Sequence, residues 1–367
     1  MKWKFSLLGL SLAVFLSGCG GGGENENTSG NAEGSQTGGG SAEGTEDTGE
    51  EGNNNQETVS INFATPDPEN ASITVAANEF ADRVEEKSDG SIEVEVHGDG
   101  SLYGGDPSAA INQLGEGSLD MLALSSTVYA NSESKFNAIS IPYLYDDKDQ
   151  YIDLLNDDLG QQLLENIKDS GINGLNYWPR NFRQITNSVN PINEPSDLEG
   201  LKLRVPNNPL WVDFFEAAGA NPTPMDFGEV YNALQLGTID GQENPVEIPV
   251  NANFYEVQDY ISMTNHMADA WVVGINSEVF NEISSEQQDI IQNTADEMQQ
   301  WLREYDTDQT EEMIQTLKDQ GMEVNEVSDE NQQKFVEISQ SQYSSFRDVV
   351  GDDEYFNKVL EFVGKAQ

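Results

Sequence analysis

The residues best suited to chemistry are three arginines that lie close together in a strongly acidic chain. The 367 residues contain only 17 Lys and Arg against 66 Asp and Glu, with a formal net charge of −49. Arg180 and Arg183 fall within "WPRNFRQ", and Arg204 follows in "LKLRVP". A guanidinium is permanently charged, and its planar fork fits a carboxylate through two parallel hydrogen bonds. The cluster therefore predicts a site for a small organic anion. Pairing with nearby acids is the alternative for each arginine, and for Arg180 it is the favoured one.

Other kinds of site find little support in the sequence. The chain has two histidines, His97 and His266, far apart along it, and it lacks HExxH, CxxC, P-loop, GxGxxG and GxSxG motifs. We therefore expect no enzyme activity, no cofactor and no metal. A hydrolase that uses two acids, such as Asp240 and Glu243, is the weakest alternative, since loop capping or contacts to ligand hydroxyls suit these two residues better. The negative charge also excludes nucleic acid as a partner.

The N-terminus carries a targeting signal. Residues 1–19 combine two lysines, an apolar run and "LSGC", which resembles the bacterial lipobox, and Cys19 is the only cysteine. We predict a lipoprotein signal peptide, lipidation of Cys19 and a location on the outer face of the cell membrane. Residues 20–57 hold Gly, Ser, Asn and Glu without any large apolar residue, which predicts a disordered tether.

The acidity extends beyond the tether into the remaining residues. Such charge keeps a protein soluble but adds self-repulsion, which dissolved salt screens. We therefore predict adaptation to a salty or alkaline exterior, that is, a halophilic protein, against the alternative of an ordinary acidic secreted protein.

Residues 58–367 alternate between strand-like and helix-like patterns, which predicts an α/β fold with largely parallel sheet. Strands are expected at 59–65, 92–96, 119–125, 171–178 and 197–206, with helices at 71–87, 107–116, 149–169 and 209–218. Asp226 and Gly237 are expected to bound a further helix. Arg204 then lies at the carboxyl end of its strand, where ligands bind in such sheets.

Residues 284–321 read as helix throughout, with Ser284 and Gln287 as a capping box and Gly321 at the end. Unbroken, this helix would be about 55 Å long and could brace two domains. A break at 306–310 is the alternative.

Three long segments resemble one family: "RQITNSVNPINEPSDLEGLKLRVP", "GANPTPMDFGEVYNALQLGTIDGQENP" and "FYEVQDYISMTNH". They look like the DctP-type substrate-binding proteins of TRAP (tripartite ATP-independent) transporters. The resemblance implies a two-domain flytrap, like the periplasmic binding proteins, with a long helix crossing both domains. It suggests domain I at 58–180 plus 268–310 and domain II at 181–267 plus 311–367.

The resemblance also implies the site. Arg204 would make the principal two-pronged contact with a ligand carboxylate, and Arg183 would lie nearby. Asn244 would contact the carboxylate or a neighbouring oxygen, and Phe227 would pack on the ligand. No role follows for Arg180.

Hydroxyls at the end of the 119–125 strand suit a ligand with further oxygens. We expect Ser125 and Ser126, with Thr127, to line the first-domain wall, and Glu243 to contact ligand hydroxyls; Asp106 and Tyr129 are weaker candidates. A sugar acid and a dicarboxylate remain equally compatible ligands. The implied partner is a membrane permease, the expected state is a monomer, and the alternative function is a sensory lipoprotein that presents an organic acid to a signalling receptor.

Overall fold

The computed structural model describes residues 58–366. The predicted signal peptide 1–19, the lipidation site Cys19 and the tether 20–57 lie outside the described residues. In the described part, no helix is both long enough and apolar enough to cross a bilayer.

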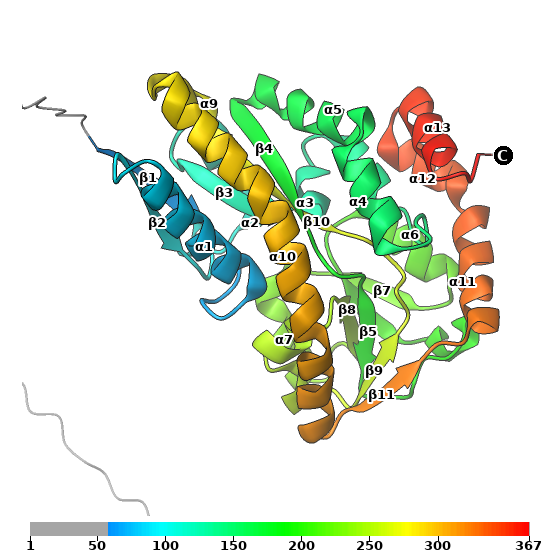
Figure 1. Ribbon diagram of the computed structural model, residues 1–367. Helices are drawn as coiled ribbons and strands as arrows, with labels where there is room; N and C mark the ends of the chain where they lie inside the picture. The colour runs from blue at the N-terminus through cyan, green and yellow to red at the C-terminus, as the bar shows by residue number, and fades with distance from the viewer. Residues whose placement is uncertain (1–57, 367) are drawn as a thin grey trace, which may run out of the picture. The chain divides into compact units, whose positions relative to one another are not determined.

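Two β-sheets organise this part of the chain (Figure 1). The first has the order β2-β1-β3-β10-β4. Its strands are β1 (Val59–Ala64), β2 (Ile92–His97), β3 (Met121–Ser125), β4 (Ile172–Pro179) and β10 (Ala270–Asn276). The second has the order β11-β9-β5-β8-β6-β7. Its strands are β5 (Gln184–Asn187), β6 (Lys202–Val205), β7 (Asn221–Pro224), β8 (Gly241–Asn244), β9 (Tyr260–Met263) and β11 (Glu323–Glu326).

Helices cover both faces of the first sheet because its strands are apolar on both faces. In β3, Met121 and Ala123 belong to one core, whereas Leu122 and Leu124 belong to another on the opposite face. The helices of this part are α1 (Ser72–Lys87), α2 (Pro107–Gly115), α3 (Ser126–Tyr129), α4 (Lys148–Asn156), α5 (Asp158–Asn166), α9 (Ser277–Glu282) and α10 (Ser285–Asp319). Those around the second sheet and near the C-terminus are α6 (Pro209–Ala217), α7 (Val230–Gln235), α8 (Glu247–Asn251), α11 (Asp329–Ser341), α12 (Tyr343–Val350) and α13 (Asp353–Phe362).

The prediction of largely parallel sheet holds for only part of each sheet. β10 pairs antiparallel with β3 and β4, and β5 pairs antiparallel with β8 and β9. The chain passes from the first sheet to the second between β4 and β5, and it returns between β9 and β10. The antiparallel strands β5 and β10 are thus the first strands after these two crossings.

The long helix α10 is continuous over 35 residues, without the break considered at 306–310. Ser284 and Gln287 form the predicted capping box. The helix packs on α1 and β4 of the first sheet and also contacts α8 and β11 near the second. The helix predicted to start at Asp226 is shorter: a 3-10 turn covers Phe227–Glu229, and α7 starts at Val230. The Asp226 carboxylate accepts a hydrogen bond from Asn207 instead of capping the helix.

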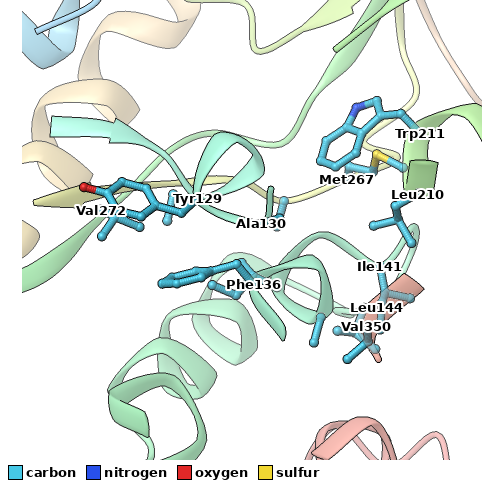
Figure 2. Packing of buried hydrophobic residues seen from close by; sticks show 14 of the residues in the cluster. Tyr129, Ala130, Phe136, Ile141, Leu144, Leu210, Trp211, Met267, Val272 and Val350 are labelled. Atoms are coloured by element: carbon cyan, nitrogen blue, oxygen red, sulfur yellow. The ribbon is translucent and has the colours of Figure 1, made fainter. Parts of the chain in front are cut away.

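The largest apolar core is shared by elements of both sheets. Figure 2 shows part of it, with Tyr129, Phe136 and Val272 beside the first sheet and with Leu210 and Trp211 from α6. The C-terminal helices contribute Phe335, Phe346 and Val350 to the same core. The domain boundaries at 180, 268 and 310 stay a prediction, since this core is continuous.

Candidate functional site

The β4–β5 and β9–β10 connections between the sheets lie side by side and place charged residues between them. The amide of Arg180 donates to the carbonyl of Asp269 (3.2 Å), and that of Arg183 donates to the carbonyl of Met267 (2.9 Å). The amide of His266 donates back to the carbonyl of Arg183 (3.2 Å). The paired backbones therefore fix Arg180 and Arg183 against Asp269 and His266.

Arg204 enters from β6 and differs from the other two arginines of the cluster in its partners. Its Nε and Nη2 both donate to the carbonyl oxygen of Met225 (3.1 and 2.8 Å), and its guanidinium carbon lies 6.0 Å from the centre of the Phe227 ring. The residue is 4% exposed. Within residues 58–366 it has no carboxylate within 4.0 Å, and burial lowers the pKa of Arg204 to about 10. A buried cation without a counterion is costly, so this guanidinium is poised to receive an anion.

Arg183, by contrast, is already neutralised. Its Nε donates to Oε2 of Glu243 (2.5 Å), and its Nη2 donates to Oε1 of the same carboxylate (2.9 Å). Nη2 also donates to Oδ1 of Asn244 (2.9 Å), and Nη1 donates to Asp269 (3.2 Å). The predicted ligand-contacting arginine is thus bound to two acids, and one of its effects is to orient the side chain of Asn244.

Glu243 lies behind the pocket wall rather than in its lining, and it is fully buried. Burial opposes its ionisation, but the charge of Arg183 and hydrogen bonds from His266 and Arg183 lower the pKa of Glu243 to about 2. His266 Nε2 lies 3.2 Å from Oε2 of Glu243, and burial lowers the pKa of His266 despite this partner. The group is therefore an internal ion pair and leaves no carboxylate oxygen for a ligand hydroxyl at Glu243.

The carboxylate of Asp269 is the common hydrogen-bond partner of the hydroxyls at the end of β3. Ser125 and Ser126 each donate to its carboxylate at 2.9 Å, and Thr127 Oγ1 lies 3.5 Å from it. Arg180 donates to Oδ2 of the same carboxylate (2.8 Å). The structure thus ties Ser126, which is fully buried, to Asp269 behind the pocket; Ser125 contacts Asp269 and also lines the pocket.

Arg180 lies in the pocket lining but is also paired. Its guanidinium carbon lies 4.2 Å above the centre of the Trp271 ring, and its Nη2 is 3.7 Å from Oε1 of Glu247. Burial works against its charge, yet the carboxylates of Asp269, Glu247 and Asp67 raise the pKa of Arg180. Its role is to balance buried acids, in line with the interpretation favoured for it from the sequence.

These side chains surround one pocket with about 570 Å³ of space between atoms, open solvent at its mouth included. Six predicted residues meet there: Arg204, Arg183, Asn244, Phe227, Ser125 and Thr127. The remaining lining residues are Pro66, Asp67, Pro107, Leu124, Val128, Arg180, Pro206, Ile248 and Trp271. The mixture of apolar walls with few polar groups is typical of small-molecule sites.

Two weaker candidates lie elsewhere. Asp106 is exposed and caps α2 by accepting hydrogen bonds from the amides of Ser108 and Ala109 (3.0 and 3.1 Å). Tyr129 is fully buried in the apolar core. Neither residue belongs to the pocket lining.

Sequence reasoning missed Asp67, Asp269 and Trp271. Asp67 comes shortly after Ala64, the last residue of β1, in "FATPDP", at the carboxyl end of a parallel strand, so its position carried a signal. Asp269 and Trp271 lie at and beyond the return from the second sheet, where no local motif distinguishes them among so many acids and core aromatics.

Comparisons with known proteins agree with this architecture. Residues 63–348 match the family model DctP, described as bacterial extracellular solute-binding protein, family 7. The chain is 32% identical over 265 residues to the 2,3-diketo-L-gulonate-binding periplasmic protein YiaO of Escherichia coli, covering 72% of this chain and 80% of that protein. It is 28% identical over 307 residues to the C4-dicarboxylate-binding protein DctB of Bacillus subtilis, covering 83% of this chain and 87% of that protein.

A solved relative extends the agreement to three dimensions. The crystal structure of the sugar acid binding protein DctPAm from Advenella mimigardefordensis, in complex with galactonate, superposes with a TM-score of 0.79. Its sequence is 32% identical, and the match covers 84% of this chain and 99% of that chain. The predicted α/β two-domain fold of the binding proteins is thereby confirmed. The chain belongs to family 7 of the bacterial extracellular solute-binding proteins, the DctP family of TRAP transporter substrate-binding proteins, whose members are receptors and not enzymes.

Proposed function

We propose that this protein is a lipid-anchored extracytoplasmic receptor that captures a small organic carboxylate and delivers it to the membrane permease of a TRAP transporter. One observation carries the proposal: Arg204 lies buried in the pocket without a carboxylate partner among the described residues, whereas its neighbours Arg180 and Arg183 are paired. A ligand carboxylate would supply the missing counterion.

The surroundings of Arg204 suit such a ligand. Two of its donors are held by the carbonyl of Met225, which fixes the plane of the guanidinium. The ring of Phe227 and the apolar wall beside it would shield the contact from water, which strengthens an ion pair. Asn244, oriented by Arg183, would add a contact through its side-chain amide, and Ser125 would add one through its hydroxyl oxygen from the first sheet.

Relatives define the ligand class in which to search. Their names state 2,3-diketo-L-gulonate, C4-dicarboxylates and, for the solved complex, galactonate. We infer that this chain binds an acid of the same kind, either a sugar acid or a dicarboxylate.

The test is titration calorimetry with galactonate, gluconate, galacturonate, succinate and malate against the protein and three variants. Arg204→Ala should weaken binding of the best ligand at least ~100-fold, because unpairing one member of a buried charge pair costs roughly 3–5 kcal/mol. Arg204→Lys should also weaken it, since a point charge cannot replace the fork. Arg83→Ala removes a partly exposed arginine paired with Glu79 and is the matched control. A change below about threefold for Arg204→Ala would contradict the assignment, given that tenfold corresponds to about 1.4 kcal/mol.

The anchor and the partner need separate measurements. Mass spectrometry of membrane-extracted protein should find a diacylglyceryl group on Cys19, and an unmodified Cys19 would remove the anchor from the proposal. A deletion strain should lose uptake of the labelled ligand. Normal uptake with a lost transcriptional or chemotactic response would favour the sensory alternative, because the same pocket serves both functions.

A further inference from the structure

We propose that the pocket selects organic acids with a single carboxylate and hydroxyl donors at the far end, and that Asp67 is the specificity-determining residue that excludes a second carboxylate. This inference rests on the proposed function and narrows its ligand class from two candidates to one.

Asp67 is a rigidly held acid in the pocket lining. It follows β1, is 6% exposed, and belongs to the lining of the same pocket as Arg204. Its backbone carbonyl accepts hydrogen bonds from Thr74 Oγ1 and from the amide of Asp99, both at 2.9 Å. Across the described residues, no hydrogen bond to its carboxylate and no ion pair within 4.0 Å is formed. The backbone thus fixes an acid whose carboxylate still lacks a donor.

All but one of the arginines that line the pocket already have a carboxylate partner among the described residues. Arg180 binds Asp269 (2.8 Å) and lies 3.7 Å from Glu247. Arg183 binds Glu243 and Asp269. Arg204 is the lining arginine that remains without a carboxylate in the described structure, so a single ligand carboxylate completes the pairing of the cations.

A second carboxylate would find no free cation and would meet a fixed negative group. Arg204 comes from the second sheet, whereas Asp67 comes from the first, and the two do not pair within 4.0 Å. A ligand that spans from one to the other therefore needs an acceptor group at Arg204 and a donor group at Asp67. Hydroxyls donate, but ionised carboxylates cannot, and like charges brought together in a closed site cost several kcal/mol.

The groups around Asp67 determine its charge. Burial, helped by the charges of Glu247 and Asp99 and opposed by that of Arg180, raises the pKa of Asp67 to about 6. The carboxylate is therefore ionised at neutral pH, where it accepts hydrogen bonds and repels anions.

Matched acid pairs test this inference directly. D-Galactonate and galactarate share their carbon chain and hydroxyl configuration, and differ only in a terminal hydroxymethyl group against a carboxylate; D-gluconate and D-glucarate form a second pair. In calorimetry at neutral pH, we expect at least one aldonate to bind at least ~30-fold more tightly than its aldarate, which equals about 2 kcal/mol.

Asp67→Asn keeps the shape and an acceptor oxygen but removes the charge. This substitution should reduce the ratio of aldonate affinity to aldarate affinity to below about fivefold. The main change should be tighter aldarate binding, because the substitution removes the repulsion between Asp67 and the second carboxylate. Asp99→Asn is the matched control: it removes an equal charge from an exposed neighbour outside the pocket lining, at a backbone φ of 58° that asparagine tolerates. It should leave the ratio as in the wild type.

The outcomes separate this inference from the proposed function. An aldarate that binds the wild type as tightly as its aldonate overturns the inference and leaves the proposed function intact. A zwitterionic amino acid that binds more tightly than every aldonate also overturns it, because an ammonium would then be the donor. Failure of every carboxylate to bind would remove the proposed function and the inference together. If Asp67→Asn does not fold, the wild-type ratios alone decide.

Discussion

Two neighbouring regions of this protein use the same residue type in opposite ways. In the ion network between the sheets, formed by Arg180, Arg183, Asp269, Glu243, Glu247 and His266, each arginine has a carboxylate partner. At the pocket wall on β6, Arg204 has only the carbonyl of Met225. Arginine is therefore structural in the first region and free to bind a ligand in the second.

The difference shows what an acidic chain must do to bind an anion. Its surface field repels the ligand, so attraction has to come from a local cation. That cation must also be kept away from the protein's own abundant acids. Burial of Arg204 against a carbonyl and the Phe227 ring does this, while Asp269 and Glu243 occupy the arginines next to it.

Removal of Asp269, the acid that Arg180 and Arg183 share, should have the largest effect on stability, because it breaks the ion network. Asp269→Asn leaves the buried guanidinium groups of Arg180 and Arg183 without their common partner, so we expect about 3–5 kcal/mol less stability in urea unfolding. Asp149→Asn, which frees the partly exposed Arg303, is the control and should cost less than about 1 kcal/mol. Equal effects of the two substitutions would show that the network contributes no more than a surface pair.

Matched substitutions of the two arginines should sharpen the comparison. Arg183→Met should destabilise the fold by roughly 3 kcal/mol because it leaves the buried carboxylate of Glu243 without its arginine partner. Arg204→Met should leave the unfolding free energy unchanged or up to about 1 kcal/mol higher, since it removes an unpaired buried cation. Chemical unfolding and calorimetry on both variants provide the measurement. If Arg204→Met unfolds the protein, Arg204 is structural and the contrast fails.

The sequence predicts the pocket wall on β6 better than it predicts the ion network between the sheets. Arg204 was found because alternation along β6 and the stop at Pro206 place it at a strand end, which depends only on local geometry. Partner choice in the network depends on contacts between distant segments: Arg183 meets Glu243 across 60 residues, and Ser125 meets Asp269 across 144. Any of the chain's many acids could have taken these places, so the sequence did not show that Ser126 and Glu243 would lie behind the wall. The long helix was predicted from its cap and periodicity, whereas its continuity through 306–310 depends on packing against both sheets.

A third test uses pH to probe Asp306, a buried acid outside the ion network. Burial and the charge of Glu247 raise the pKa of Asp306 on α10 from 3.8 to about 7. A raised folded-state pKa gives stability that is present below pH 3.8 and is lost as the pH rises through about 7. The wild type should therefore gain stability over Asp306→Asn, on the order of 1 kcal/mol, when the pH falls from neutral to mildly acidic. The comparison between the two proteins cancels the same trend from Asp67 and Glu247 and the opposite one from His266. Parallel curves would mean that Asp306 stays ionised.

Salt should distinguish the exposed acids of the surface from the buried ion pairs of the network. Its effect on the network is the smallest effect that we predict. Raising NaCl from about 0.1 M to about 1 M shortens the screening length from ~10 Å to ~3 Å, which relieves repulsion among exposed acids. If the chain is adapted to salt, its melting temperature should rise over this range, and a flat profile would contradict that proposal. Buried pairs are screened much less, so the destabilisation caused by Asp269→Asn should change by less than about 0.5 kcal/mol between the two salt concentrations. If the destabilisation by Asp269→Asn disappears at high salt, Asp269 is in contact with solvent. The ion network would then no longer differ from the pocket wall on β6 in being shielded from solvent.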